Sequence, residues 1–143
     1  MVNKTVIIIQ CRFRSSRLPG KALLPIANKM TIIEFLIRRL KNVRNVEEVV
    51  LTTGEHSSND KICEIAKNLD IKVFRGPEND VLGRFLNAAN TTCADTIVRV
   101  CGDNPLTDPG LIEDLVDYYT HNKIEHLSTF ENPSVPYGSG CAI

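Results

Sequence analysis

The sequence has no tryptophan, no excess of charge of either sign and no long hydrophobic run. Its 17 basic residues are balanced by 17 acidic ones, whereas a protein that binds nucleic acid through the phosphates is normally basic. No basic helix interleaved with aromatic residues is found either, so nucleic acid is not expected as a partner. The apolar run before Arg12 is too short for a secretory leader or a membrane-spanning helix. We therefore expect a cytoplasmic protein with no membrane partner.

The cysteines lack any pattern that would indicate a cross-link or a metal site. There are five of them, an odd number, and no C-x-x-C pair occurs. A disulfide framework or a zinc site would need a regular, even set. We expect buried free thiols in a reducing compartment.

Two common phosphate-binding motifs are also absent. The P-loop reads G-x-x-x-x-G-K-[ST], and Gly20-Lys21 is the G-K pair in question. Ser15 stands where the first glycine belongs, and Ala22 replaces the hydroxyl that would hold Mg²⁺. The Rossmann G-x-G-x-x-G pattern is missing too. Any phosphate site must therefore be of another kind.

Short apolar runs alternate with helical patterns along the whole chain. A composition of 43% hydrophobic and 24% charged residues is typical of a globular protein. The alternation predicts a three-layer α/β fold with a mainly parallel sheet. We treat residues 1–143 as one nucleotide-binding domain. Strands are predicted at 5–9, 47–53, 71–76, 96–102 and 125–130, and helices at 31–41, 62–69, 82–89 and 108–119.

Apolar spacing predicts which face of each helix is buried. Residues three, four and seven apart share a face, and the four inner sets are Ile33, Leu36, Ile37 and Leu40; Ile62, Ile65, Ala66 and Leu69; Leu82, Phe85, Leu86 and Ala89; and Ile112, Leu115, Val116 and Tyr119. Thr31 with Glu34 reads as a capping box, and Asp108 precedes Pro109 as an N-cap. Asn79 or Asp80 is expected to cap the third helix.

A basic stretch follows the first predicted strand. Within ten residues it carries four cations: Arg12, Arg14, Arg17 and Lys21. In open α/β sheets, ligands bind beyond the carboxyl ends of the strands. Arginine forks, a lysine, the hydroxyls of Ser15 and Ser16, and Gly20 can together hold a polyphosphate there. The alternative is a solvated basic surface loop.

Two further loops follow strands and reach the same edge. Asp103 ends the fourth strand and is a candidate Mg²⁺ ligand, since Mg²⁺ takes one or two carboxylates plus phosphate oxygens. The alternative is a simple turn, because Asp-Asn-Pro is good turn chemistry. The stretch RGPENDVLGRF, at the end of the third strand, holds Arg75, Gly76, Asp80 and Arg84.

These three stretches resemble a known family. Residues 10–26, QCRFRSSRLPGKALLPI, are similar to the signature A-R-x-x-S-x-R-L-P-G-K of the sugar nucleotidyltransferases. VFRGPENDVLGRF and ADTIVRVCGDNPLTDPGLIEDLV resemble the cytidylyltransferases of the SpsF type, from spore-coat polysaccharide biosynthesis, and the acylneuraminate and 3-deoxy-manno-octulosonate enzymes. The resemblance implies a Rossmann-like, glycosyltransferase-A-like nucleotidyltransferase domain. It implies transfer of CMP from CTP to an acidic sugar, with release of pyrophosphate and use of Mg²⁺.

The resemblance also implies roles for individual residues. Those that would bind the triphosphate are Arg12, Ser15, Ser16, Arg17 and Lys21, with Gly20 in the same loop; Arg12, Arg17 and Lys21 would act on the reacting phosphates. Asp103 would hold Mg²⁺. Arg75, Gly76 and Asp80 match a loop that lies near the nucleotide base.

Two alternatives to an active cytidylyltransferase stay open. Relatives run on past this C-terminus into a sugar-binding and often dimer-forming region, so we expect a chain that is truncated relative to them. A shortened chain is compatible with a non-catalytic nucleotide-binding or oligomerisation module, including a homodimer. A nucleotide-sugar glycosyltransferase is less well supported, because it usually has a D-x-D pair and here Asp103 and Asp108 are five residues apart.

Overall fold

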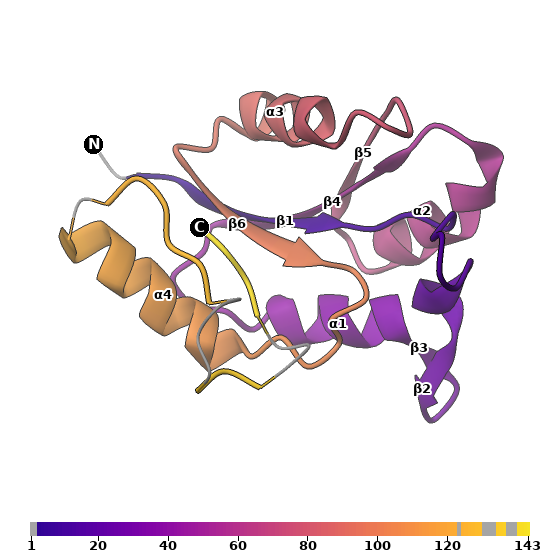
Figure 1. Cartoon of the computed structure of the whole chain (residues 1–143), viewed down its shortest axis with the longest axis horizontal. Helices are drawn as coiled ribbons and strands as arrows, with labels where there is room; N and C mark the ends of the chain where they lie inside the picture. Colours follow the sequence, from indigo (N-terminus) through magenta and orange to yellow (C-terminus); the bar gives the residue numbers. More distant parts are fainter. Residues whose placement is uncertain (1–2, 123, 130–133, 137–139) are drawn as a thin grey trace.

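Four parallel strands form the central sheet, in the order β5-β4-β1-β6. The computed structural model describes residues 3–122, 124–129, 134–136 and 140–143. All three strand pairs are parallel, so every strand ends at the same edge of the sheet (Figure 1). The strands are β1 (Thr5–Gln10), β4 (Glu48–Gly54), β5 (Lys72–Gly76) and β6 (Thr96–Cys101).

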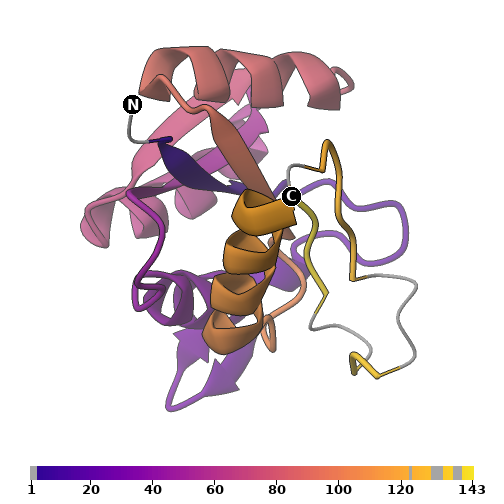
Figure 2. The ribbon, with the colours of Figure 1, turned by 90° about the vertical axis from the view of Figure 1, so that its left-hand side faces the viewer.

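Helices cover both faces of this sheet, which confirms the predicted three-layer α/β fold. Helix α3 (Val81–Thr92) lies over one face. On the other face lie α1 (Ile32–Leu40), α2 (Asp60–Asn68) and α4 (Pro109–Asn122). Figure 2 shows α3 and α4 on opposite sides of the strands. A small hairpin of β2 (Pro25–Ala27) and β3 (Met30–Thr31) precedes α1.

The central strand β1 contributes side chains to both hydrophobic cores. Side chains alternate across a strand, so Ile7 and Ile9 enter the larger core beneath α1, α2 and α4. Val6 and Ile8 enter the smaller core beneath α3. All four are fully buried, as the apolar run of residues 5–9 predicts for a central parallel strand. Burying each such side chain stabilises the fold by about 1.5–3 kcal/mol.

The predicted N-caps Thr31 and Asp108 and three of the four predicted inner faces are confirmed. Of the predicted capping box, only the bond to the Thr31 hydroxyl is present among the described residues. The Thr31 hydroxyl accepts a hydrogen bond from the Glu34 amide at 3.3 Å, and the Asp108 carboxylate accepts one from the Leu111 amide at 3.0 Å. The carboxylate of Glu34 pairs with Arg38. Each of the helices α1, α2 and α4 turns its predicted apolar set towards the larger core.

The predicted inner face of α3 is partly wrong. Leu82 is 79% exposed and Leu86 is 59% exposed. Phe85 and Ala89 of the predicted set do face the sheet, and the small Ala88 lies there with them. The carboxylate of Asp80 accepts a hydrogen bond from the Gly83 amide at 2.8 Å and fixes where the helix begins. Because the helix begins there, its alanine-bearing face lies against the sheet, and these small side chains let α3 pack closely.

The predicted fifth strand at residues 125–130 is also wrong over its described part, 125–129. Ser128 forms only an isolated bridge with Ala142, and Ala142 bridges Arg99 of β6 on its other side. The Arg99 amide donates to the Ala142 carbonyl at 2.7 Å, and the Ile143 amide donates to the Leu127 carbonyl at 2.8 Å. The last residues of the chain thus take the place beside β6, and the segment around Ser128 lies one step further out.

The cysteines are all free thiols, and three of them, Cys11, Cys63 and Cys141, are buried as expected. Cys93 departs from that expectation, because it is exposed at the end of α3, and Cys101 is only partly buried. Within the described residues, no helix combines the length and apolar character needed to cross a lipid bilayer.

Candidate functional site: a basic loop at the carboxyl edge of the sheet

The basic loop, residues 12–21, begins directly after β1 and is held by backbone hydrogen bonds. The Cys11 amide donates to the Thr52 carbonyl of β4 at 3.1 Å. The Phe13 amide donates to Oδ1 of Asn59 at 2.8 Å. The Gly20 amide donates back to the Phe13 carbonyl at 2.8 Å and closes the loop. The cations of the loop are therefore carried on a fixed backbone.

Asn59 is the anchor of this loop. Its side chain is fully buried. Its amide nitrogen lies within hydrogen-bond distance of the carbonyls of Gly54 and His56 and of Oε2 of Glu78. One side chain thus joins the basic loop to the end of β4 and to the segment after β5.

Two glycines are required by close approaches in this region. Gly20 has a left-handed φ of 74°, which favours glycine, and a Cβ there would lie 2.9 Å from the Phe13 ring. A Cβ on Gly102 would lie 2.6 Å from Cβ of Cys11. The Gly102 amide donates to the Gln10 carbonyl at 2.8 Å. The ends of β1 and β6 are therefore in direct contact.

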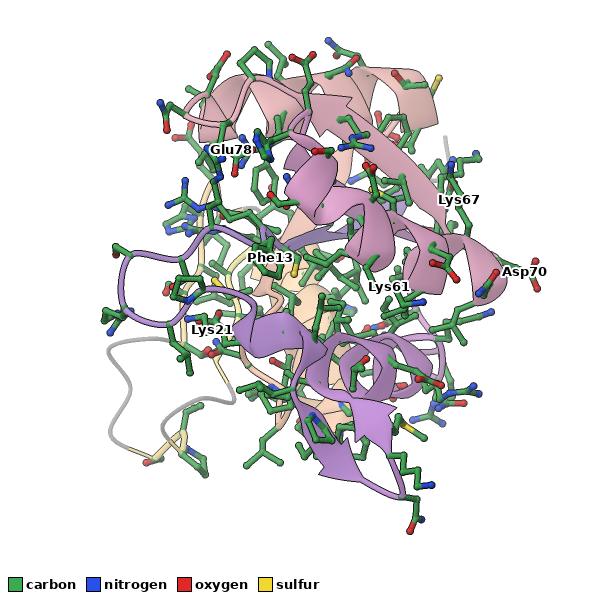
Figure 3. The ribbon with its side chains drawn as sticks, turned by 90° about the vertical axis from the view of Figure 1, so that its right-hand side faces the viewer. Phe13, Lys21, Lys61, Lys67, Asp70 and Glu78 are labelled. Carbon is green, nitrogen blue, oxygen red and sulfur yellow. The ribbon has the colours of Figure 1, made fainter. Side chains whose placement is uncertain are left out.

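The loop and the end of β6 enclose a cavity of about 220 Å³. Six of the residues predicted from the sequence line it together, and Gly20 lies in the same loop. Figure 3 shows Phe13 and Lys21 at the side of the molecule from which this loop projects. The full lining is Gln10, Cys11, Arg12, Ser15, Ser16, Arg17, Lys21, Ala22, Arg99, Cys101, Gly102 and Asp103.

Lys21 and Asp103 form an ion pair in this cavity. Nζ of Lys21 donates to Oδ2 of Asp103. The two residues lie 82 positions apart in the sequence, and the contact of β1 with β6 brings them together. Both side chains are partly exposed, at 25% for Lys21 and 36% for Asp103, so both are accessible to an entering ligand.

The two thiols in the cavity are poor nucleophiles. Burial, reinforced by the negative charge of Asp103, raises the pKa of Cys11 to about 12. Burial also raises the pKa of Cys101, against the opposing effect of Arg99. Because the thiolate is the nucleophilic form, covalent catalysis by either cysteine is disfavoured near neutral pH. The cavity is suited to binding anions.

The three residues predicted near the base do not line the cavity. The guanidinium of Arg75 donates to the carbonyls of Gly54, Glu55 and His56 and pairs with Asp60. Gly76 is buried beneath the Arg84 side chain. Asp80 caps α3, which confirms the expectation that Asn79 or Asp80 would do so. Arg75 and Gly76 thus end β5, and Asp80 lies in the loop between β5 and α3.

The remaining charged candidates have structural partners outside the cavity. Asp108 caps α4 and pairs with Arg39 at 3.6 Å, so it does not form an acidic pair with Asp103. Arg14 lies 2.9 Å from Nε2 of His56. His121 and His126, like His56, are exposed and do not line the cavity.

Sequence reasoning missed two polar groups that line the cavity. They are Gln10, the last residue of β1, and Arg99 of β6, and the position of Gln10 at a strand end was the available signal. Arg84, which the sequence placed with Arg75, Gly76 and Asp80 after the third strand, does not line the cavity. It is buried, although an arginine in a helix normally lies in solvent.

Comparison with known proteins gives one consistent result. Residues 6–139 match the family model described as Cytidylyltransferase. The chain is 30% identical over 119 residues to the spore coat polysaccharide biosynthesis protein SpsF of Bacillus subtilis, covering 80% of this chain and 49% of that protein. The chain spans about half the length of the curated relatives it matches.

Two solved structures are similar to this one. A cytidylyltransferase from Leptospira borgpetersenii serovar Hardjo-bovis has 40% identity and a TM-score of 0.93, covering 98% of this chain and 59% of that one. CMP:2-keto-3-deoxy-manno-octonic acid synthetase complexed with CTP has 27% identity and a TM-score of 0.72, covering 85% and 49%. The fold is thus the nucleotidyltransferase fold of that synthetase, and this chain belongs to the cytidylyltransferase family.

Proposed function

We propose that this chain binds CTP in the cavity and transfers its CMP moiety to a hydroxyl of an acidic sugar, releasing pyrophosphate. The observation that carries the proposal is the convergence of Arg12, Arg17 and Lys21 with Asp103 on one cavity. A structure in the same fold, at 27% identity, is a complex with CTP.

The proposed reaction is an in-line displacement at phosphorus. The sugar hydroxyl oxygen bonds to the α-phosphorus, and the bond from that phosphorus to the bridging oxygen of the leaving pyrophosphate breaks. Such chemistry depends on positioning and on stabilising charge. Arg17 and Lys21 would stabilise the leaving pyrophosphate, and Arg12, with the Ser15 and Ser16 hydroxyls, would orient the phosphates.

The residues present fit a magnesium ion only if it is shared with the nucleotide. No group of three His, Cys, Asp or Glu side chains suited to a metal occurs among the described residues. Asp103 is a single, partly exposed carboxylate. Mg²⁺ is commonly held by one or two carboxylates together with substrate phosphates and water. Asp103 would hold the ion, which would neutralise phosphate charge.

The first test is calorimetric titration with CTP, ATP, GTP and UTP, each with and without Mg²⁺. We expect CTP to bind most tightly and Mg²⁺ to increase its affinity. Lys21→Ala and Arg17→Ala should each weaken CTP binding about 10-fold to 100-fold, the value of a lost hydrogen bond between charged groups. Variants that bind as tightly as the parent would contradict the assignment of the basic loop.

Asp103→Asn gives a result of opposite sign in the two conditions. In EDTA it should bind CTP more tightly than the parent, because the carboxylate repels phosphate and pairs with Lys21. In Mg²⁺ the gain in affinity seen with the parent should be lost. If Mg²⁺ increased the CTP affinity of parent and variant equally, Asp103 would have only a structural role in the turn.

The acceptor sugar and the oligomeric state need separate tests. Two relatives named as 3-deoxy-manno-octulosonate cytidylyltransferases, at 31% and 29% identity, make that acidic sugar the first acceptor to assay by pyrophosphate release. A protein that binds CTP without releasing pyrophosphate would favour the non-catalytic alternative. Sedimentation tests the predicted homodimer.

A further inference from the structure

Three side chains carried by strands, and not by the basic loop, also line the cavity. They are Gln10 of β1 and Arg99 and Cys101 of β6. The register of the two strands pairs Gln10 with Cys101 and Ile8 with Arg99. Paired residues, and residues two apart on one strand, share a face of a sheet. Gln10, Arg99 and Cys101 therefore lie together on one face.

This face of the sheet is open at β6, which is the last strand in the order of the sheet. Val98 and Val100, on the opposite face of β6, are buried in the larger core. Ile97 and Cys101 are only partly buried, and Arg99 between them is exposed. The core beneath α3 has Ile97 at its margin and does not extend to Arg99. A ligand can therefore reach Arg99 without displacing α3.

The backbone that carries Arg99 is held on both sides. On one side β6 pairs with β1. On the other, the Arg99 amide donates to the Ala142 carbonyl at 2.7 Å, and the Ala142 amide donates to the Arg99 carbonyl at 3.2 Å. A binding group on a paired strand is positioned more precisely than one on a loop.

The arginines that line the cavity differ from the other arginines of the chain. Each of the others has a polar partner: Arg14 lies beside His56, Arg84 donates to backbone carbonyls, and four pair with carboxylates, namely Arg38, Arg39, Arg44 and Arg75. Among the described residues, no oxygen or nitrogen atom accepts a hydrogen bond from the guanidinium of Arg12, Arg17 or Arg99. The guanidinium groups without such partners are thus gathered in the cavity.

No described carboxylate balances the charge of Arg99. Its neighbours on the same face, Gln10 and Cys101, are neutral, because burial raises the pKa of the Cys101 thiol. Asp103 is paired with Lys21. A guanidinium fork binds the two oxygens of a carboxylate or of a phosphate. Arg99 is therefore available to an anionic group of a ligand, whereas a neutral base would leave its charge unbalanced.

The direction of the proposed reaction places the acceptor on the side of Arg99. In a phosphoryl-type displacement the attacking and leaving oxygens lie roughly in line, on opposite sides of the phosphorus. The proposed function puts the leaving pyrophosphate against Arg17 and Lys21 of the basic loop. The acceptor then enters the part of the cavity that the loop does not line, and Arg99 is the cation that the strands supply there.

We propose that Arg99 binds the carboxylate of the acceptor sugar and so makes the enzyme select an acidic acceptor. The proposal rests on the proposed function, which supplies CTP as the donor. Arg12, Arg17 and Lys21 then act on the nucleotide, and Arg99 acts on the acceptor alone.

The test is calorimetric titration of the acceptor into protein saturated with Mg²⁺ and a CTP analogue whose α,β-bridging oxygen is replaced by CH₂. The probes are 3-deoxy-manno-octulosonate, the acid named for two relatives, and its methyl ester, which lacks the charge. We expect the parent to bind the acid about 10-fold to 100-fold more tightly than the ester. Arg99→Met should bind the acid as weakly as the ester, with unchanged affinity for the ester and for the CTP analogue. Arg99→Lys keeps the charge without the fork and should recover part of the preference.

Arg99 is exposed and forms no ion pair among the described residues, so both variants should unfold within a few degrees of the parent. Arg38→Met, which removes an ion pair with Glu34 on α1, is the matched control and should keep the preference for the acid. A parent that binds acid and ester alike, or Arg99→Met with the parent's preference, would overturn the proposal. So would a loss of affinity for the CTP analogue in Arg99→Met as large as the loss for the acid, because Arg99 would then serve the nucleotide. A parent that binds no CTP analogue would overturn the proposed function itself.

Discussion

Single residues at the ends of β1 and β6 set the shape of the cavity. Gly102 lets the two strand ends touch, and that contact carries Asp103 towards Lys21. Neither of the charged residues would meet the other if the strand ends were pushed apart. The size of one side chain therefore controls the geometry of the site.

Gly102→Ala should both destabilise the protein and weaken its binding of CTP. The new Cβ would lie 2.6 Å from Cβ of Cys11 and 3.1 Å from the Gln10 carbonyl, so the strand ends must separate. Overpacking of this kind costs about 1–3 kcal/mol, measurable as a lower urea midpoint. Gly110→Ala is the control, because only a carboxylate oxygen of Asp108 lies as close as 3.0 Å to the added methyl group. Equal stability of Gly102→Ala and Gly110→Ala would contradict the prediction.

For single residues, the sequence predicted the location correctly where that location follows from position along the chain alone. Arg12, Arg17 and Lys21 follow a buried strand, and a parallel sheet puts such loops at one edge. Arg75 also follows a strand, yet its guanidinium is engaged by the carbonyls after β4. That engagement depends on the path of another segment, which spacing does not encode.

At the scale of elements, α3 shows what determines which face of a helix is buried. The predicted face combined Leu82 and Leu86 with Phe85 and Ala89, but only Phe85 and Ala89 of that set pack on the sheet, together with Ala88. Residues on either side of this face share the same helical spacing, so periodicity could not decide which side is buried. Close packing against the sheet favours the side with small residues.

Substitutions on the two faces of α3 should therefore differ sharply in cost. Phe85→Ala removes a ring from the smaller core and should lower the free energy of unfolding by about 3–5 kcal/mol. Leu86→Gln, its neighbour on the exposed face, should change it by no more than about 0.5 kcal/mol. Urea unfolding of both variants measures the difference. A loss at Leu86 as large as that at Phe85 would mean that the exposed leucine face is covered in solution.

The segment around Ser128 gives the second lesson about elements. A strand was predicted at residues 125–130, yet Ala142 occupies the place next to β6 and Ser128 lies beyond it. The order of strands at an edge depends on pairing between distant segments. The local sequence indicates whether a segment favours an extended conformation. Which segment pairs with the edge strand β6 depends on the relative stability of pairings between distant segments.

For the whole molecule, alternation of strands and helices was enough to predict the three layers, because parallel strands require crossover helices. The site followed from the same logic, since all four strands end at one edge. The sequence also predicted buried thiols, but it could not show which of the five cysteines are buried, because that depends on packing. Cys11, Cys63 and Cys141 are buried, whereas Cys93 is exposed.

Stability of the whole fold should fall as the pH rises above 9. Burial raises the pKa of Cys11 to about 12 and that of Cys141 to about 11, from an ordinary value of 9.0. Above pH 9 the unfolded chain loses these protons while the folded protein keeps them, so unfolding becomes easier. Each such thiol contributes a loss of up to about 1.4 kcal/mol per pH unit until its folded pKa is reached.

The measurement is urea unfolding of the parent, of Cys11→Ala and of Cys93→Ser at pH 8, 9 and 10. Other groups also titrate in this range, so the slope of stability against pH is compared between variants. Cys11→Ala removes one buried thiol and should show a shallower decline than the parent. Cys93→Ser changes only an exposed thiol and should follow the parent. Parallel slopes for all three proteins would mean that Cys11 gains no protection from titration by its burial beneath Asp103 and the basic loop.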